Sequence, residues 1–169
     1  MANNCYFDLH VRGSKEGIEK MIQAFEDEII GRVYNYNIYD QGYHKEENVY
    51  YVYIDGDCAW SIQSAMLDKH KIQEIIYVYR LDAEAYSEEI GIGFMEHYLY
   101  EYGELIKDEC RDFFSFYIED IEEDEEYGNS VFNFELVKKA GITKENYKQF
   151  PDCEGQIRIG GFDYEYVIN

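Results

Sequence analysis

Carboxylates are the most numerous residues that could do chemistry, and they are concentrated in one stretch of the chain. Between Asp82 and Glu126 there are 17 acidic and two basic residues, so 45 of the 169 residues carry a net charge of −15 out of −21. The stretch ends in residues 119–126, where seven of eight residues are acidic. Such a surface repels phosphates and attracts basic groups. The chemistry that it offers is electrostatic recognition.

We expect these carboxylates and the tyrosines between them to form one partner-binding surface. Carboxylates at alternate strand positions lie about 6.6 Å apart, and those three or four residues apart on a helix about 5–6 Å. A folded surface can therefore approach the charge density of a DNA strand, which has one phosphate per about 3.4 Å. Tyrosines add the large, rigid contacts that are enriched at interfaces. The predicted partner-binding residues are Tyr98, Tyr100, Glu101, Tyr102, Glu104, Asp108, Glu109, Asp112, Tyr117, Glu119, Asp120, Glu122, Glu123, Asp124, Glu125 and Glu126. The simpler interpretation is a solvated acidic face or a mobile acidic loop.

Motifs for catalysis or metal binding are absent from the sequence. There is no glycine-rich phosphate loop, no H-E-x-x-H and no G-x-S-x-G. The best candidate for a general base is His97, beside Glu96, although a histidine on a surface strand is the simpler interpretation. Residues 119–126 lack the alternating Asp and Asn and the internal glycine of a calcium loop. We therefore expect a non-enzymatic protein with no catalytic residue, no cofactor and no metal site. The other histidines are scattered: His10, His44 and His70.

The cysteines and the hydropathy pattern bear on the compartment. The four cysteines are about fifty residues apart, without a C-x-x-C pair, which favours free thiols over disulfides. No apolar run approaches twenty residues, and the first residues lack the basic and apolar regions of a signal peptide. We expect a cytoplasmic protein that binds no membrane. The cysteines are Cys5, Cys58, Cys110 and Cys153.

Hydrophobic periodicity predicts a strand, a helix and a hairpin in the first third of the chain. Residues 5–11 alternate between apolar and polar, as in a half-buried strand. Ser14 is a good N-cap for a helix that ends near Gly31. Residues 32–40 and 48–54 are β-prone and are joined by a polar segment that contains Gly42, which predicts an antiparallel hairpin. The apolar stripe of the helix is Ile18, Met21, Ile22, Phe25 and Ile29.

The next elements complete a recognisable order. Asp57 is predicted to cap a second helix that runs through Trp60 and Ile62 to His70, and residues 72–81 resume the alternation of a strand. The order strand, helix, strand, strand, helix, strand predicts an α+β fold. We expect a ferredoxin-like β-α-β-β-α-β antiparallel sheet with two helices on one face.

Further strands and a small C-terminal elaboration follow. Strands are expected at residues 90–94, 96–100 and 104–109, with a turn at Tyr102-Gly103, and residues 113–118 fit a strand or a short helix. Residues 131–140 fit a helix closed by Gly141, with one more helical turn after Thr143. Residues 156–159 and 162–168 flank Gly160-Gly161, a hairpin signal. We divide the chain into a core with its sheet extension, residues 1–118, and an acidic segment with a helix and hairpin packed on that core, residues 119–169.

Two stretches resemble a known family. The stretch Ile54-Asp55-Gly56-Asp57-Cys58-Ala59-Trp60-Ser61 and the tyrosine-rich residues 89–104 resemble the YubB-type ferredoxin-like proteins of phages, plasmids and mobile elements. The resemblance covers about residues 4–109 and implies the same fold, but no established activity and no catalytic residues. It also implies an origin in a phage or mobile element. Proteins of such elements often act against host defence, as anti-CRISPR inhibitors do.

The charge and the resemblance together predict an inhibitor. We expect it to bind the basic nucleic-acid channel of a host protein, such as a defence nuclease, and to compete there with the nucleic acid. Two alternatives stay open: a generic acidic protein-interaction module, and RNA binding through an aromatic sheet face. RNA binding would act against the negative charge, and cross-strand tyrosine pairs are its simpler interpretation. The tyrosines that could stack on bases are Tyr6, Tyr50, Tyr51, Tyr53, Tyr77 and Tyr79.

Overall fold

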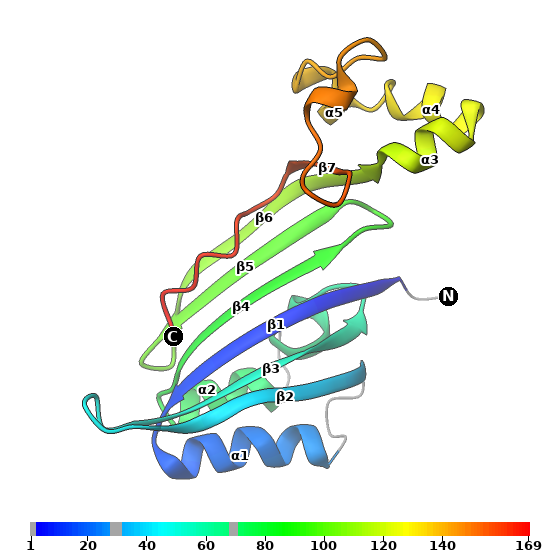
Figure 1. Ribbon diagram of the computed structural model, residues 1–169. Coiled ribbons are helices and arrows are strands. Elements are labelled where there is room, and N and C mark those ends of the chain that lie inside the picture. The colour runs from blue at the N-terminus through cyan, green and yellow to red at the C-terminus, as the bar shows by residue number, and fades with distance from the viewer. Residues whose placement is uncertain (1–2, 28–31, 68–70) are drawn as a thin grey trace. The chain divides into compact units, whose positions relative to one another are not determined.

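The chain has a mixed α+β fold built around a seven-stranded antiparallel sheet. A computed structural model describes all residues except 1–2, 28–31 and 68–70. The strand order is β2-β3-β1-β4-β5-β6-β7 (Figure 1). The chain divides into two compact units, of which unit 1 is Met1–Cys110 with Phe162–Asn169 and unit 2 is Arg111–Gly161. No helix in the described part of the chain is long and apolar enough to span a membrane.

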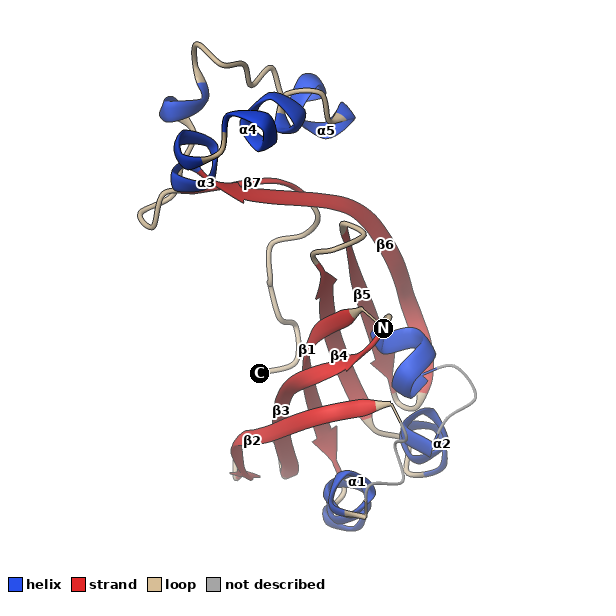
Figure 2. Cartoon of the chain, turned by 90° about the vertical axis from the view of Figure 1, so that its right-hand side faces the viewer, coloured by secondary structure: helices blue, strands red, loops and turns tan. Residues whose placement is uncertain are grey.

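Unit 1 consists of strands with two helices on one face. Figure 2 shows α1 and α2 on the same side of these strands, and the C-terminus on the opposite side. We call the side without helices the open face. The elements are β1 (Asn4–Gly13), α1 (Lys15–Glu26), β2 (Val33–His44), β3 (Val49–Ala59), the π-helical turn η1 (Gln63–Leu67), α2 (Lys71–Val78), β4 (Asp82–Glu89), β5 (Phe94–Glu101) and the first part of β6 (Glu104–Tyr117).

The predicted first strand and first helix are confirmed. Every second residue of β1 points into the core between the sheet and the helices, where Phe7, Leu9 and Val11 are buried. The Ser14 side chain accepts a hydrogen bond from the amide of Gly17 at 3.1 Å, so it caps α1 as expected. The helix is described as far as Glu26, and the predicted ends at Ile29 and Gly31 lie outside the described residues.

Among the described residues, the predicted second helix is present only as the helical turn η1, and the predicted fourth strand is misplaced. β3 continues through Asp57, and α2 occupies most of the stretch that was expected to be a strand. Ile72, Ile75 and Ile76 are buried at the three- and four-residue steps of a helix. Short apolar runs fit both periods, so the alternation of residues 72–81 was not decisive. The fourth strand is β4, and the predicted helix end at His70 lies outside the described residues.

The strand pairs around these elements agree largely with expectation. β2 and β3 pair antiparallel, but Gly42 lies within β2, and the turn is at residues 45–48. Residues 90–93 form a turn and not a strand, and β5 begins at Phe94. The turn at Tyr102-Gly103 and the strand after it are confirmed, and that strand extends through Tyr117. Residues 113–118 are therefore mainly strand.

Unit 2 has a small core of its own. β7 pairs antiparallel with the end of β6, from Phe113 to Tyr117. The predicted helix at residues 131–140 is divided between the end of α4 and α5, and Gly141 follows α5 at a φ of 72°, as expected of a C-terminal glycine. The elements after β6 are α3 (Ile118–Glu123), α4 (Glu125–Val131), α5 (Glu135–Lys139), the 3-10 turn η2 (Tyr147–Gln149) and β7 (Gln156–Gly160). The buried residues are Phe116, Val131, Val137, Ile142 and Ile157.

The predicted hairpin across Gly160-Gly161 is wrong. β7 pairs with β6, while Phe162–Asn169 contains no strand and belongs to unit 1. We call Phe162–Asn169 the C-terminal segment. The alternating aromatic residues of this segment contact the open face of unit 1, and the segment does not pair as a strand. The units thus separate after Cys110, whereas the sequence suggested a boundary between residues 118 and 119.

Candidate functional site

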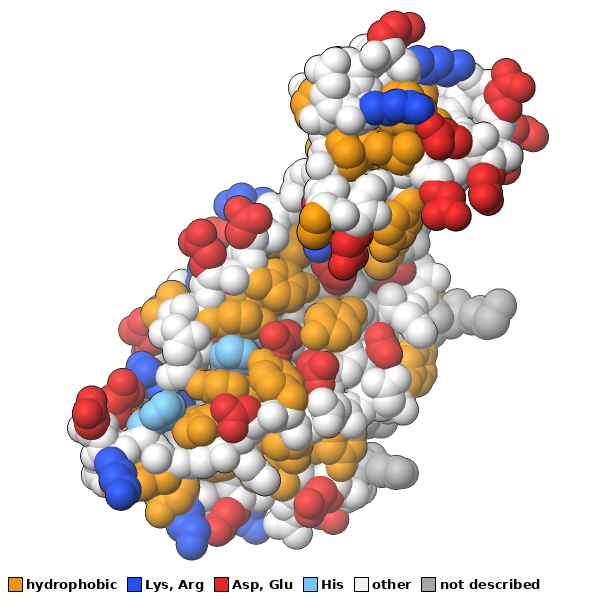
Figure 3. Space-filling view, in the orientation of Figure 1, with side chains coloured by type: hydrophobic (Ala, Val, Ile, Leu, Met, Phe, Trp, Pro, Cys, Tyr) orange, Lys and Arg blue, Asp and Glu red, His pale blue; other side chains and the backbone are white. Residues whose placement is uncertain are grey.

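The acidic run of unit 2 lies on two short helices. The seven acidic residues among residues 119–126 are all exposed, on α3, on α4 and at Asp124 between them, and Figure 3 shows acidic side chains gathered there. Asp124 caps α4, because its carboxylate accepts hydrogen bonds from the amides of Glu126 at 2.9 Å and Tyr127 at 3.0 Å. Glu122 forms an ion pair with Lys148. Acidic residues in the first turn of a helix also interact favourably with its dipole. The local structure therefore helps to hold this charge in place.

The acidic residues predicted in unit 1 lie near the β5–β6 turn and along β6. Glu101, Glu104 and Asp108 are exposed, and Glu109 is half-buried beside Lys107, with 3.8 Å between the Glu109 carboxylate and the Lys107 Nζ. Tyr102, in the turn, is exposed too, and the Arg80 guanidinium lies 5.7 Å from the centre of its ring. Asp112 and Tyr117 are exposed on the part of β6 that belongs to unit 2.

Two predicted contact residues must be removed from this surface. Tyr98 is 2% exposed and Tyr100 is 3% exposed, and both belong to the core beneath the helices. Strand alternation indicated that they share a face, but not that helices cover this face. The remaining predicted residues are divided between the two units, so they do not form one surface on one compact body. Each unit carries its own acidic surface.

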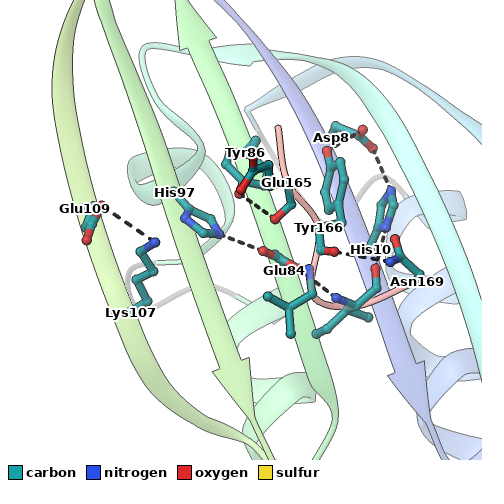
Figure 4. Close-up of polar contacts among 12 residues, drawn as sticks. Asp8, His10, Glu84, Tyr86, His97, Lys107, Glu109, Glu165, Tyr166 and Asn169 are labelled. Atoms are coloured by element: carbon teal, nitrogen blue, oxygen red, sulfur yellow. Dashed lines mark hydrogen bonds and ion pairs between the residues drawn. The ribbon is translucent and has the colours of Figure 1, made fainter. Parts of the chain in front are cut away.

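A second cluster of polar side chains lies on the open face of unit 1. β1 contributes Asp8 and His10, and β4 contributes Tyr86 and Glu84 directly opposite them. β5 adds His97, which lies opposite Tyr86. Figure 4 shows these side chains turned toward the C-terminal segment. The sequence analysis did not group them, because β4 was placed in the wrong residues.

Glu84 is at the centre of the cluster and is fully buried. One carboxylate oxygen lies 2.8 Å from His97 Nε2, and the other accepts the backbone amides of Val167 at 2.6 Å and Ile168 at 2.9 Å. Burial raises the pKa of Glu84, but the hydrogen bonds from His97 and from the two amides outweigh it, so the pKa lies below its ordinary value. The ionised carboxylate thus fixes both a ring and a stretch of backbone.

His10 lies between two tyrosine rings. Its ring centre is 4.0 Å from that of Tyr53 and 3.7 Å from that of Tyr166, and both pairs are stacked. His10 Nδ1 lies 2.8 Å from the carbonyl oxygen of Ile168, and since a carbonyl only accepts, this nitrogen carries a proton. The other ring nitrogen lies 2.7 Å from the Tyr39 hydroxyl. The ring is therefore held on both faces and on both edges.

Asp8 accepts hydrogen bonds from the tyrosine hydroxyl groups around His10. Its carboxylate accepts hydrogen bonds from Tyr39 at 3.0 Å and from Tyr166 at 2.5 Å. Burial, and then the nearby Asp8 charge, raise the pKa of both tyrosines above the ordinary value. Both phenols therefore remain protonated and can donate these hydrogen bonds at neutral pH.

Tyr86 forms a second stack of three rings. It lies between His97, with ring centres 4.0 Å apart, and Tyr164, with ring centres 4.7 Å apart. Its hydroxyl donates to the carbonyl oxygen of Glu165 at 3.1 Å. Burial, followed by the charge of Glu84, raises the pKa of Tyr86 to about 12. The two stacks together hold the C-terminal segment at two tyrosines.

The cluster has the components of acid–base chemistry but uses them to hold a peptide segment. A carboxylate that orients a histidine is a common catalytic pairing. Here His97, the predicted candidate for a general base, is buried. The Glu84 oxygen that does not contact His97 accepts hydrogen bonds from two backbone amides. Within the described residues, no group of three or more His, Cys, Asp or Glu side chains is arranged to hold a metal ion.

The cysteines fall into two pairs by exposure. Cys5 and Cys58 are buried directly opposite each other on β1 and β3, whereas Cys110 and Cys153 are exposed, and all four are free thiols. The hydrogen bond between the two buried thiols, together with burial, raises the pKa of Cys58. The Cys58 thiol is therefore held in its protonated, unreactive form.

The tyrosines considered for RNA stacking do not share one free surface. Tyr50 and Tyr79 pack against the core of unit 1, and Tyr77 is on α2. Tyr53 is stacked on His10 near the C-terminal segment. The predicted set therefore does not form one aromatic sheet face.

Comparison of the chain with protein-family models, with curated proteins and with solved structures found no match.

Proposed function

We propose that this protein is a non-enzymatic inhibitor that occupies the basic nucleic-acid site of a host protein and acts there as a polyanion mimic. The observation that carries the proposal is the surface of α3 and α4. Residues 118–131 contain seven exposed carboxylates and no basic residue. At helical spacing, neighbouring carboxylates are about 5–6 Å apart, close enough for one Arg- and Lys-rich surface to meet several at once.

The charge of both units supports the same partner. Unit 1 has 24 acidic and nine basic residues, and unit 2 has 12 acidic and six basic residues. Because both units are negative, direct binding of nucleic acid is disfavoured, and a basic protein is attracted to either one. Exposed tyrosines beside the carboxylates, such as Tyr102 and Tyr117, provide contact area.

We also infer a ferredoxin-like core from β1 to β4. The strand order β2-β3-β1-β4, with helices after β1 and β3, supports this inference. With the resemblance to YubB-type proteins, it favours an origin in a phage or mobile element. An anti-CRISPR or other anti-defence role in the cytoplasm would fit such an origin, and free cysteines fit a reducing compartment.

The alternative is a generic acidic interaction module, which would use the same surfaces on a partner that does not bind nucleic acid. RNA binding is less well supported, because the C-terminal segment contacts the open face around His10 and Tyr86. A base would have to displace the segment from this region and would meet Asp8 and Glu84 there.

Capture from host lysate on the immobilised full-length chain tests the proposal. We expect a basic, nucleic-acid-binding protein that is released as salt rises from about 50 mM to about 500 mM and that duplex DNA or RNA displaces, as for any competitor of phosphate contacts. A neutral or acidic partner would favour the generic module. A partner whose binding is unchanged across this salt range would refute charge mimicry.

Two charge-matched variants locate the binding surface. The binding-surface variant carries Gln at four acidic positions of α3 and α4, leaving Asp124 as the cap and Glu122 in its ion pair. Exposed ion pairs contribute about 0.2–1 kcal/mol each, so the loss of four should lower partner affinity by about 0.8–4 kcal/mol, or about 4- to 900-fold. The control variant carries the same charge change elsewhere and should bind normally. Equal affinities of the two variants would remove α3 and α4 from the proposal. The positions are Glu119, Glu123, Glu125 and Glu126 in the first variant, and Glu16, Glu26, Glu46 and Glu74 in the second.

A further inference from the structure

The C-terminal segment lies on the open face of unit 1 as a peptide ligand lies on a receptor. The chain leaves unit 1 after Cys110 and returns only at Phe162, with the whole of unit 2 in between. The returning segment contains no strand, so it does not join the sheet through backbone pairing. Its backbone is instead bound by side chains that project from the sheet.

Side chains of β1 and β4 recognise the backbone of the segment. Glu84 accepts the consecutive amides of Val167 and Ile168, at 2.6 and 2.9 Å. The carbonyl oxygens of the segment are met in the same way, that of Ile168 by the His10 ring and that of Glu165 by the Tyr86 hydroxyl. These hydrogen bonds recognise the backbone of an extended chain and do not depend on the side chains of that chain.

Aromatic contacts recognise every second side chain of the segment. Tyr166 stacks on His10 and donates a hydrogen bond to Asp8. Tyr164 stacks on Tyr86, and Phe162 packs edge-on against His97 with ring centres 5.9 Å apart. The face is therefore shaped for the pattern aromatic-x-Tyr-x-Tyr followed by two backbone amides.

None of these contacts requires that the segment belong to the same molecule. The segment is joined to β7 through Gly160 and Gly161, with φ of 77° and 71°, a conformation that glycine adopts without strain. Two adjacent glycines allow the chain direction to change there. An identical segment from another copy would satisfy the same groups, which is the condition for exchange of an element between protomers.

We propose that the open face of unit 1 is a binding site for an extended aromatic-x-Tyr-x-Tyr peptide, and that a second copy of this chain supplies that peptide through its own C-terminal segment. Asp8, His10, Glu84, Tyr86 and His97 form the site. A segment tethered to its own site has an effective concentration on the order of 1 mM. Exchange is therefore expected at comparable chain concentrations, or when the molecule's own segment is weakened.

Peptide binding to a weakened full-length chain tests the site. The Tyr166→Ala chain loses one stack and the Asp8 hydrogen bond, so its face is freed. We expect a fluorescent peptide of residues 162–169 to bind this chain at least tenfold more tightly than it binds the wild-type chain, whose own segment competes. The same peptide with Tyr166→Ala is the matched ligand control, and Glu84→Gln in the weakened chain is the matched receptor control. Both should weaken binding at least tenfold.

Complementation between two full-length variants tests the source of the peptide. The Tyr166→Ala chain has an intact face, and an Asp8→Asn chain has an intact segment. Mixed together, they should form a heterodimer in native mass spectrometry that neither forms alone. Tyr166→Phe, which keeps the ring and loses the hydroxyl, replaces Tyr166→Ala if circular dichroism shows that the latter is unfolded. A folded, weakened chain that binds no peptide would overturn the site, and a mixture that stays monomeric would overturn the second copy as its source.

Discussion

Removing the Glu84 carboxylate is the most direct perturbation of the open face. Glu84→Ala leaves three donors without their acceptor, namely His97 Nε2 and the amides of Val167 and Ile168. Glu84→Gln keeps the volume and one acceptor oxygen, so the two amides can still be satisfied. The pair of variants therefore separates the loss of charge from the loss of the acceptor.

The size of the effect follows from burial. A buried donor left unsatisfied costs about 1–3 kcal/mol, so the three donors at Glu84→Ala set an upper limit of about 9 kcal/mol. The amides can recover hydrogen bonds with water if the C-terminal segment detaches, which limits the loss. We therefore expect a net loss of about 3–5 kcal/mol, below that upper limit. Glu84→Gln should cost about 1–2 kcal/mol, because charged hydrogen bonds are replaced by neutral ones.

Urea unfolding followed by tryptophan fluorescence measures this loss in the right part of the molecule. Trp60 is the only tryptophan and lies in unit 1, so its signal reports on that unit. Hydrogen exchange at the amides of Val167 and Ile168 provides a local readout and should be fast in Glu84→Ala and intermediate in Glu84→Gln. If Glu84→Ala unfolds within about 0.5 kcal/mol of the wild type and the two amides stay protected, the assigned role of Glu84 is wrong.

Three further predictions concern pH, thiols and glycines. The folded-state pKa of Glu84 is below its ordinary value, so the stability that Glu84 contributes is present above about pH 4.3 and is lost as pH falls through the folded-state pKa. The difference in unfolding free energy between wild type and Glu84→Gln should therefore shrink between pH 7 and pH 3. A constant difference would contradict the assignment. Iodoacetamide should modify the exposed Cys110 and Cys153 in the native protein at least about 100-fold faster than the buried Cys5 and Cys58. Mass spectrometry measures these rates, and equal rates would show that the buried pair is accessible. Gly160→Ala should destabilise unit 2 more than Gly141→Ala, by about 1–3 kcal/mol in thermal unfolding. Both glycines have positive φ, but of the two only Gly160 would bring an added Cβ against a neighbour, the Asp112 carbonyl oxygen; equal losses would mean that the backbone relaxes.

Local patterns were enough to predict the elements whose signals act over a few residues. The alternation of residues 5–11, the Ser14 cap and the turn at Tyr102-Gly103 are all present in the structure. A cap or a tight turn depends on hydrogen bonds between near neighbours, so it can be predicted from neighbouring residue types. Clean period-two alternation likewise reflects one buried face of a strand.

Prediction failed where two local solutions were equally good. Residues 72–81 contain apolar and aromatic residues at spacings that fit a strand and a helix, and the helix formed because it buries Ile72, Ile75 and Ile76 together. The Gly160-Gly161 turn signal was also ambiguous. The strand before the two glycines, β7, pairs with β6, while the aromatic residues after them bind to the open face of unit 1.

The candidate sites show the same division. The sequence by itself determined that residues 119–126 are highly charged, that the chain is acidic throughout and that its strands have two unlike faces. Only the tertiary structure decided that helices cover Tyr98 and Tyr100, and that Asp8, His10 and Glu84 meet a segment about eighty residues or more away in the chain. Charge is a property of each residue, whereas burial depends on which distant segments come together, because the hydrophobic effect is non-directional and rewards any arrangement that removes apolar area from water.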